Sequence, residues 1–231
     1  PIRRTTILTR IMRAVVAGMI KKASFYLSTI GDATGSDLFW KRVFDVAVSA
    51  SILLVTLPLT AIAALAILLE DGGPVFSRRT LTGRHGLPFQ MLRLRVLNVE
   101  AEAAAAIRAR ADAAWDLTLV GQFLQFCRID EIPQLLSVIA GDMSIIGPKP
   151  LSPRVSTLWA QRLPLFANRH AVKPGLIGCA RDSYPSGNSL AAVRGMLKHD
   201  LDYLARRSLA EDMAILFGTI TDPNWLQSED A

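Results

Sequence analysis

Cysteine and histidine are scarce in this chain of 231 residues. The two cysteines, Cys127 and Cys179, lack the spacing of metal ligands and cannot form a disulfide framework, which fits a reducing compartment. The three histidines, His85, His170 and His199, lie far apart in the sequence. The sequence therefore shows no signature of a histidine-based metal site or of a catalytic triad.

Aromatic residues make up only 7% of the chain, and the 26 basic residues outnumber the 20 acidic ones. The net charge is +6, the isoelectric point is about 9.7, and 51% of the residues are hydrophobic. This composition favours an anionic partner, namely phospholipid, nucleic acid or a phosphorylated substrate. Proteins that bind single strands interleave basic and aromatic side chains, and that interleaving is missing here. The sequence thus predicts no nucleic-acid partner; a membrane-tethered nucleic-acid-binding protein is supported by the isoelectric point alone.

Charge is absent altogether from residues 46–69. As one helix this run would be about 36 Å long, which exceeds the ~30 Å hydrocarbon core of a bilayer. It begins far from the first residue and lacks a cleavage-site pattern, which argues against a signal peptide. We therefore expect the run to enter a membrane; the alternative is a buried core helix.

Pro58 lies in the middle of this run and removes a helical hydrogen bond. Each of the two arms is only about 16–18 Å long, so neither crosses a bilayer alone. Lys41 and Arg42 precede the run, and Arg78 follows it, so basic residues on both sides place both ends in the cytoplasm. The sequence predicts a re-entrant helix–break–helix over residues 41–70, with a kinked spanning helix as the alternative.

The predicted fold class is mostly α with a few short strands, and the re-entrant helix precedes a small cytoplasmic α/β catalytic domain with amphipathic interfacial helices. Residues 1–40 form a basic leader or interfacial segment and a linker, 71–222 the catalytic domain and 223–231 a tail. Two short strands are expected within 72–97. Helices are expected over 99–115, 117–127, 132–140, 152–171 with a disturbance at Pro164, 189–207 and 208–220.

Two glycine- and proline-containing stretches in this domain, "GDMSIIGPKPL" and "VKPGLIG", are predicted to be a loop and a turn. The last helix carries an apolar stripe that we expect to face the core. Its members are Leu209, Met213, Leu216, Phe217 and Ile220.

Two adjacent carboxylates, Asp130 and Glu131, stand in the otherwise apolar stretch "RIDEIPQLL". Adjacent carboxylates repel each other, so they share a cation or one of them has a raised pKa. Mg²⁺ is commonly held by carboxylate oxygen together with substrate phosphate. A carboxylate can also attack phosphorus as a nucleophile. The alternative is a helix-terminal acidic pair capped by backbone amides.

Several motifs in a fixed order over residues 41–220 resemble the bacterial sugar transferases, the monotopic phosphoglycosyl transferases. The signature "IDEIPQLLSVIAGDMSIIGPKP" closely resembles the family pattern LDELPQ…GDMSxVGPRP. The other blocks that are similar are "KRVFD", "GPVF", "RRTLTGRHGLPF", "VKPGLIGCA" and "HDLDYLARRSLAEDMAILFGTI".

The resemblance implies transfer of a phospho-sugar from a UDP-sugar to undecaprenyl (polyprenyl) phosphate, with release of UMP. This reaction starts an exopolysaccharide or glycan repeat unit at the cytoplasmic face of the bacterial inner membrane. By the same resemblance Asp130 is the catalytic nucleophile, which forms a covalent phosphosugar intermediate, and Glu131 is a catalytic residue that holds Mg²⁺. Membrane lipids and a possible homodimer complete the implied partners.

Some positions depart from the family pattern. Gln125 and Leu81 stand where the family has arginine, and Lys149 replaces the arginine of GPRP. A lysine keeps the charge but loses the bidentate fork for phosphate. The positions expected to supply the charge that binds substrate phosphate are Arg128, Lys149, Arg181, Arg95 and Arg79. These substitutions leave open a second reading, in which the chain is a non-catalytic relative that acts as a membrane scaffold in polysaccharide assembly.

Overall fold

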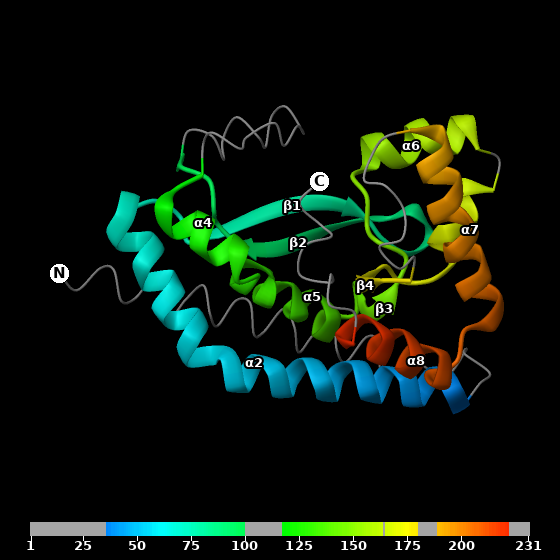
Figure 1. Cartoon of the computed structure of the whole chain (residues 1–231), viewed down its shortest axis with the longest axis horizontal. Coiled ribbons are helices and arrows are strands. Elements are labelled where there is room, and N and C mark those ends of the chain that lie inside the picture. The colour runs from blue at the N-terminus through cyan, green and yellow to red at the C-terminus, as the bar shows by residue number, and fades with distance from the viewer. Residues whose placement is uncertain (1–35, 100–116, 164, 180–188, 222–231) are drawn as a thin grey trace.

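The computed structural model describes residues 36–99, 117–163, 165–179 and 189–221. Most of the expected leader, the alanine-rich segment expected to be a helix over 99–115, and Arg181 lie outside the described residues. The described chain is mostly helical with four short strands, as the sequence predicts. Figure 1 shows a long bent helix along the lower and left sides of the molecule, with the remaining elements gathered on the inner side of its bend.

The long apolar run forms one helix, α2, from Ser36 to Asp71, with Pro58 inside it. It begins ahead of the expected residue 41 and continues through the proline, although two separate arms were expected. Figure 1 shows that it bends between two straight parts. Prolines cause most sharp bends in helices, because the missing N–H and the ring open the turn before them. The break predicted at Pro58 is thus a bend in a continuous helix.

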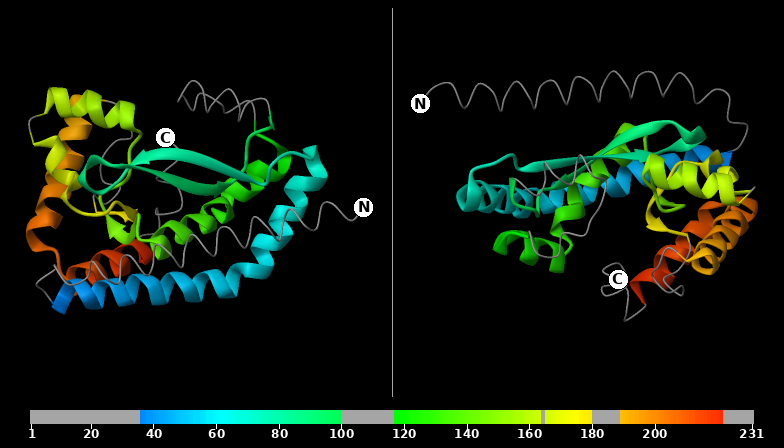
Figure 2. Two further views of the ribbon diagram at one scale, coloured as in Figure 1. Left: turned by 180° about the vertical axis from the view of Figure 1, so that it is seen from behind. Right: turned by 90° about the horizontal axis from the view of Figure 1, so that it is seen from above.

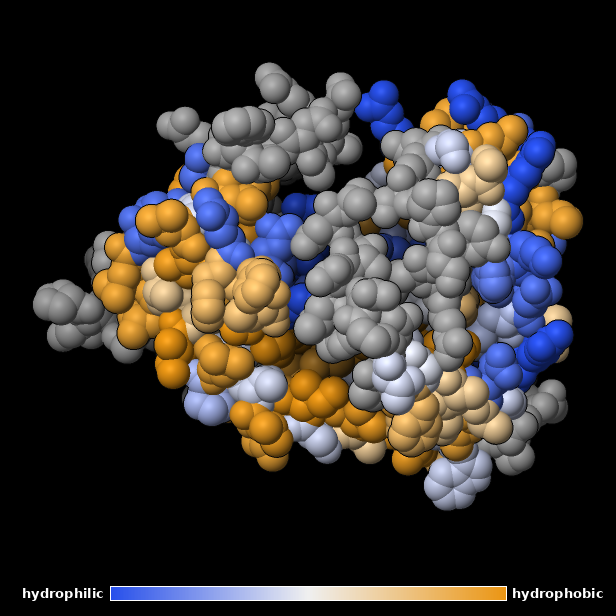
Figure 3. All heavy atoms as spheres, in the orientation of Figure 1, coloured by the Kyte–Doolittle hydropathy of each residue, from blue (hydrophilic) through white to orange (hydrophobic). Residues whose placement is uncertain are grey.

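The outer face of α2 is apolar and exposed. Leu54, Val55 and Leu69 are each more than 70% exposed. In the most apolar stretch of 18 residues of this helix, only 11% is buried. Among the described residues, length, composition and the small buried share therefore suit a membrane better than the alternative of a core helix. Figure 3 shows these apolar side chains along the lower and left edges of the molecule.

A hairpin follows α2. Strands β1 (Phe76–Thr82) and β2 (Pro88–Leu94) pair antiparallel, with the short helix η2 (Arg84–Gly86) in the turn. This confirms the two short strands expected within 72–97, where Leu92 and Leu94 alternate with Arg93. In the ladder Arg79 lies opposite Met91 and Ser77 opposite Arg93, so all four side chains share one face of the hairpin.

Three short helices connect the hairpin to the centre of the domain. They are α4 (Leu119–Phe126), the 3₁₀ helix η3 (Ile129–Gln134) and α5 (Leu135–Ala140). Helix α5 contacts both α2 and β2 and lies between α2 and the hairpin, as the left view of Figure 2 shows. Leu124 and Ile129 pack with Ala63 of α2 and Leu94 of β2 in one apolar cluster.

The two stretches predicted to be a loop and a turn form strands instead. β3 (Ser144–Gly147) and β4 (Gly175–Gly178) pair in parallel, with Ser144 opposite Gly175. Alanine at Gly175 would bring its Cβ to 2.1 Å from the amide nitrogen of Gly147, so the strands approach closely only because both residues are glycine. Pairing between segments far apart in the chain thus overrides the local turn signals.

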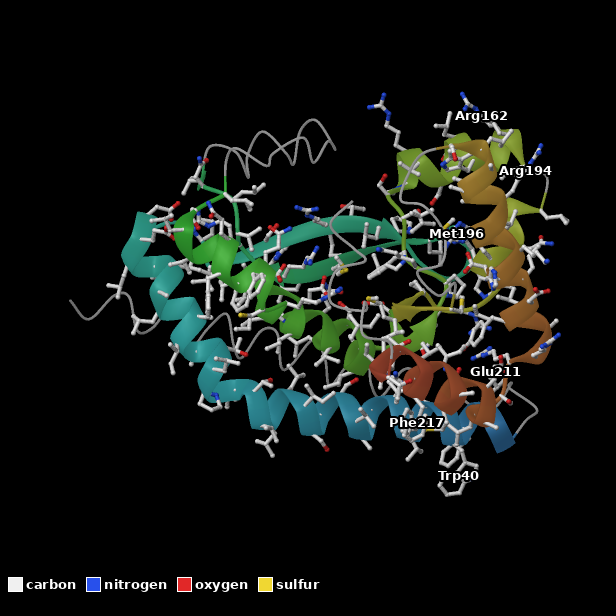
Figure 4. All side chains as sticks on the ribbon, in the orientation of Figure 1. Trp40, Arg162, Arg194, Met196, Glu211 and Phe217 are labelled. Carbon is white, nitrogen blue, oxygen red and sulfur yellow. The ribbon has the colours of Figure 1, made fainter. Side chains whose placement is uncertain are left out.

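The remaining helices close the domain. They are α6 (Pro153–Arg162), η4 (Phe166–Ala171), α7 (Leu190–Arg206) and α8 (Leu209–Ile220). Helix α6 ends before Pro164, as predicted. The stripe expected to face the core on α8 does so only in part. Leu216 packs against the central apolar cluster, whereas Phe217 is 65% exposed and the buried positions include Asp212 and Ile215. Figure 4 shows Trp40 near the start of α2, directed away from the domain.

Candidate active site

The carboxylate pair begins η3 directly after a tight turn. Helix α4 ends at Phe126, and Arg128 adopts a left-handed backbone conformation with φ of 55°. The chain reverses there, so that Ile129 packs into the apolar cluster and Asp130 turns toward β2. Pro133 belongs to the same 3₁₀ helix and is buried. The apolar neighbours that looked unusual in the sequence therefore anchor the turn that carries the carboxylates.

A single arginine on β2 bridges the two carboxylates. Arg93 Nη2 lies 2.9 Å from Asp130 Oδ2 and 2.6 Å from Glu131 Oε1. Arg128 Nη2 contacts the other oxygen of Glu131, Oε2, at 3.3 Å. Two guanidinium groups thus compensate two carboxylates, and the repulsion that adjacent carboxylates feel is offset within the site.

The two carboxylates differ in their access to water. The side chain of Asp130 is 5% exposed, whereas that of Glu131 is 23% exposed. Burial raises the pKa of Asp130 to about 6, although Arg93 pulls this pKa down and Glu131 pushes it up. Asp130 is therefore a shielded carboxylate that is still mostly ionised at neutral pH.

One hydrogen-bond donor of Arg93 is unused among the described residues. Its Nε atom is buried and has no hydrogen-bond partner among the described residues. Buried N–H groups are nearly always paired in native proteins, because an unpaired one loses its hydration without compensation. An unpaired guanidinium N–H beside a carboxylate is suited to an oxygen of a bound anion.

The residues predicted to bind substrate phosphate differ in location and contacts. Arg79 shares the hairpin face with Arg93, and Arg128 contacts Glu131. Lys149 lies in the loop after β3 with an exposed side chain, and its backbone carbonyl accepts a hydrogen bond of 2.9 Å from Arg169 Nη2. Arg181 lies outside the described residues.

Arg95 requires a correction. Its guanidinium is 1% exposed and pairs with Asp71 at the end of α2, while Nε donates to the carbonyl of Pro74 and Nη1 to that of Leu97. These contacts hold the hairpin to α2 and leave the side chain shielded from a substrate. Arg93, which was not among the predicted site residues, meets the carboxylates instead. The "RLR" alternation places both arginines on one face of a strand, but β2 ends at Leu94 and Arg95 lies beyond it.

Among the described residues, no group of three or more His, Cys, Asp or Glu side chains could hold a metal ion. Mg²⁺ does not need such a cage, because it is commonly bound by one or two carboxylates together with substrate phosphates and water. The partly exposed carboxylate of Glu131 fits that requirement. Its oxygens already contact Arg93 and Arg128, so the residues present could hold a magnesium ion only together with a phosphate ligand.

Comparison with known proteins identifies the family. Residues 36–223 match the family described as Bacterial sugar transferase. A UDP-glucose:undecaprenyl-phosphate glucose-1-phosphate transferase of Caulobacter vibrioides is 37% identical over 194 residues, which cover 83% of this chain and 71% of that protein. The exopolysaccharide production protein PSS of Rhizobium leguminosarum is 32% identical over 80% of this chain and 94% of its own length.

A further relative differs in the sugar of its name. The UDP-N-acetylgalactosamine-undecaprenyl-phosphate N-acetylgalactosaminephosphotransferase of Aeromonas hydrophila is 30% identical over 89% of this chain and 49% of its own length. The relatives of Caulobacter vibrioides and Aeromonas hydrophila thus share a type of reaction in their names but not one sugar. The chain belongs to the bacterial sugar transferase family, and the prediction that it is a phosphoglycosyl transferase is confirmed.

Proposed function

We propose that the chain transfers a phospho-sugar from a UDP-sugar to undecaprenyl phosphate through a covalent intermediate on Asp130. The observation that carries this proposal is the setting of Asp130: a buried carboxylate, bridged by Arg93, with an unpaired Arg93 N–H beside it. A shielded carboxylate is a better nucleophile than a hydrated one, and the spare donor is placed for a phosphate oxygen. The names of the relatives support the UDP-sugar and the lipid phosphate as substrates.

Two displacements at phosphorus complete the reaction. In the first, a carboxylate oxygen of Asp130 attacks the β-phosphorus of the UDP-sugar, and the bond from this phosphorus to the bridging oxygen breaks. UMP leaves with that oxygen, and the phosphosugar is held on Asp130 as an acyl phosphate. In the second, an oxygen of undecaprenyl phosphate attacks the same phosphorus and the carboxylate of Asp130 leaves. Arg93 and Arg128 compensate the negative charge brought by the phosphates.

Glu131 is the residue that would hold Mg²⁺, because it is the more exposed carboxylate of the pair. The ion would supply charge neutralisation for the diphosphate and the departing UMP. Arg128 and Arg93 keep the Glu131 side chain oriented.

Contacts at both ends of α2 support the re-entrant arrangement. Near its start Lys41 pairs with Asp212 of α8, and near its end Asp71 pairs with Arg95 of the hairpin. One folded domain therefore binds both ends, and a rigid body of this kind lies on one side of a membrane. The exposed apolar bend between the ends would dip into the bilayer and return. Basic residues near both ends favour the cytoplasmic face of the bacterial inner membrane.

The test is a half-reaction without the lipid acceptor. Purified protein in detergent, incubated with a panel of UDP-sugars, should release UMP and gain the mass of one phosphosugar on Asp130. Asp130→Asn should reduce both to less than about one thousandth of the wild-type level, because an amide is a poor nucleophile. Asp202→Asn, an exposed carboxylate on α7, is the matched control and should behave as wild type. Chelator should abolish UMP release, and added Mg²⁺ should restore it.

Two outcomes would contradict the proposal. If no donor in the panel yields UMP or an adduct, and cells carrying Asp130→Asn still make polysaccharide, the chain is a membrane scaffold rather than a catalyst. UMP release that is indifferent to chelator would remove Mg²⁺ from the reaction. A homodimer and the absence of a nucleic-acid partner stay predictions of the sequence.

A further inference from the structure

A buried ion pair contacts the loop that follows β3. Arg169 of η4 and Asp200 of α7 are almost completely buried, and Nε and Nη2 of Arg169 each lie 2.9 Å from Asp200 Oδ2. A charged pair is tolerated in an interior when its remaining hydrogen-bonding atoms also find partners. Two of these partners follow the strands of the parallel sheet: Lys149 comes after β3 and Cys179 after β4.

Arg169 joins the pair to the loop after β3. Its Nη2 atom donates a hydrogen bond of 2.9 Å to the backbone carbonyl of Lys149, and its Nη1 atom has no hydrogen-bond partner among the described residues. Every hydrogen bond of this guanidinium within the described chain therefore goes to Asp200 or to that one carbonyl. These contacts connect α7 to the loop.

The backbone of Lys149 is restricted on both sides. Pro148 and Pro150 flank it, and a residue that precedes a proline is confined to extended conformations. The carbonyl of Pro148 accepts a hydrogen bond of 3.0 Å from the amide of Gly175 on β4. Because Pro150 has no N–H, the Lys149 carbonyl is the only hydrogen-bonding group of the next peptide unit. The contact with Arg169 therefore orients this peptide, and with it the direction in which the Lys149 side chain leaves the loop.

A thiol completes the pair from the other strand. Cys179 is 7% exposed, and its Sγ atom donates to Asp200 Oδ1 at 3.3 Å, so each oxygen of this carboxylate has a partner. Burial raises the pKa of Asp200, whereas Arg169 and the thiol both lower it. Burial also raises the pKa of Cys179, so this side chain is a hydrogen-bond donor and not a reactive thiolate. Cys179 thus helps to keep Asp200 in the ionised form that holds Arg169.

We propose that Arg169 is a positioning residue for the diphosphate of the sugar donor: it orients the loop from which Lys149 binds phosphate, and Cys179 secures Asp200 behind it. The inference rests on the proposed function for the identity of the ligand. Lys149 has an exposed side chain on a backbone that is held in place, at the carboxyl end of a strand in a parallel sheet, where ligands commonly bind. A lysine is a point charge on a flexible stem, so its contribution depends on where the backbone places it.

The first test removes both charges of the pair. Arg169→Met alone leaves the carboxylate of Asp200 buried without its cation, and we expect the midpoint of thermal unfolding to fall by about 6 °C or more. Arg169→Met/Asp200→Leu should recover much of that loss. The new side chains would lie beside the apolar cluster of Phe166, Val193 and Leu197 between η4 and α7. This double variant separates stability from positioning, because it still lacks the donor to the Lys149 carbonyl.

Binding of UDP with MgCl₂, measured by calorimetry in detergent, reports on the diphosphate site without any turnover. We expect the Kd of Arg169→Met/Asp200→Leu to rise about tenfold, the loss typical of one hydrogen bond to a charged group. Lys41→Met/Asp212→Leu is the matched control, since it removes another buried ion pair of this domain. It should keep the wild-type Kd.

A second comparison shows whether Arg169 acts through Lys149. Lys149→Met should raise the Kd for UDP about tenfold, whereas Lys198→Met, which removes an exposed lysine of α7, should not. Adding Lys149→Met to Arg169→Met/Asp200→Leu should bring little further loss, because the loop then has no cation to position. Independent effects would instead multiply to about a hundredfold.

Cys179 offers a milder pair of variants. Cys179→Ala leaves Asp200 Oδ1 without a donor, while Cys179→Ser keeps a hydroxyl that can donate to it. We expect Cys179→Ala to raise the Kd for UDP roughly threefold and Cys179→Ser to stay close to wild type. This pair decides the matter if Arg169→Met/Asp200→Leu does not fold, and equal values for the two variants would then overturn the inference.

The remaining outcomes separate the inference from the proposed function. A stable Arg169→Met/Asp200→Leu that binds UDP like wild type would make the pair purely structural, and multiplying effects would mean that Arg169 does not act through Lys149. Absence of UDP binding by the wild-type protein would overturn the inference together with the proposed donor. If UDP binds with the expected ratios but no UDP-sugar yields UMP, the proposed function fails and the positioning role of Arg169 stands.

Discussion

The charge of Asp130 is subject to two opposing influences. Burial favours the protonated carboxyl and raises the pKa to about 6, while Arg93 favours the carboxylate. Because the pKa in the folded protein is above its ordinary value, the folded state gains stability from the protonated form below pH 4. That contribution is lost as the pH rises through about 6. At neutral pH the fold therefore keeps a carboxylate at a cost in stability, which is common at sites where a side chain must react.

The pH dependence of UMP release should follow this carboxyl. We expect the rate to rise with pH to a plateau, with an apparent pKa of about 6, because the protonated carboxyl does not attack phosphorus. Arg93→Gln should move the midpoint to higher pH, since this arginine lowers the pKa of Asp130. Arg78→Gln is the control: Arg78 is exposed on the opposite face of β1 and should leave the midpoint in place. An unchanged midpoint in Arg93→Gln would show that Arg93 does not lower the pKa of Asp130.

At the scale of elements, the charged residues at the start of α2 join it to the domain. Lys41 Nζ pairs with Asp212 of α8, whose other oxygen accepts a hydrogen bond of 2.8 Å from Tyr203. Arg42 donates to the carbonyls of Val138 and Ile139 at the end of α5, at 2.7 and 2.9 Å. The basic residues that the sequence suggested as a membrane flank are therefore also structural contacts.

Asp45 also attaches α2 to the domain, because its carboxylate accepts hydrogen bonds at the edge of β3 that pairs with no described strand. It accepts hydrogen bonds from Ser144 Oγ at 2.7 Å and from the amide of Ile145 at 3.3 Å. A two-stranded sheet leaves its outer backbone groups unpaired, and side chains of α2 replace the missing strand. The motif "KRVFD" thus connects α2 to α8, α5 and β3 at once.

Breaking the buried ion pair should destabilise the protein strongly. Lys41→Met leaves the carboxylate of Asp212 buried at 1% exposure without its cation, and we expect a loss of about 3 kcal/mol or more in the free energy of unfolding. The double variant Lys41→Met/Asp212→Leu removes both charges and should recover much of that loss. Thermal unfolding of the purified proteins in one detergent measures both. A single variant as stable as wild type would mean that the pair contributes nothing to docking α2.

At the scale of the whole molecule, α2 runs along two sides of the domain (Figure 1). The outer face of this helix is exposed and contacts no other described element. Two exposed hydroxyl groups are satisfied within the helix, since Ser51 donates to the carbonyl of Ala47 at 2.8 Å and Thr56 to that of Ile52 at 2.7 Å. A helix without unpaired polar groups on an apolar face is suited to hydrocarbon. The domain contacts at both ends and the apolar bend together favour insertion from one side.

Accessibility of the two ends of α2 tests this topology. Single cysteines are placed at Trp40 and Arg78, both exposed, in a Cys127→Ser background because Cys127 is an exposed thiol. In intact cells a membrane-impermeant thiol reagent should label neither, and after the inner membrane is opened it should label both. Labelling of one site from the periplasm would contradict the re-entrant arrangement. Pro58→Leu, which restores the missing hydrogen bond, should favour a straight spanning helix and expose one of the two sites to the periplasm.

Much of this protein follows from local features of the sequence. The uncharged run with Pro58 inside it predicts an apolar membrane segment interrupted at the proline, because hydropathy and a missing N–H act within a few residues. The structure shows that interruption as a bend within one continuous helix. The alternation around Arg93 and Arg95 predicts the hairpin for the same reason. Asp130 and Glu131 stand out because two adjacent carboxylates in an apolar stretch require compensation wherever the chain places them.

The tertiary structure decided what depends on partners far apart in the chain. Ser144–Gly147 and Gly175–Gly178 become strands only because they meet each other, and each alone has the signals of a loop or a turn. On α8 Asp212 faces inward, where Lys41 lies opposite it, while Phe217 of the predicted apolar stripe is exposed. Arg93 reaches the carboxylates while Arg95 is taken by Asp71, a choice that depends on how the hairpin packs against η3 and α2. Local periodicity carries no information about such contacts, since the free energy that selects them comes from groups brought together only by folding.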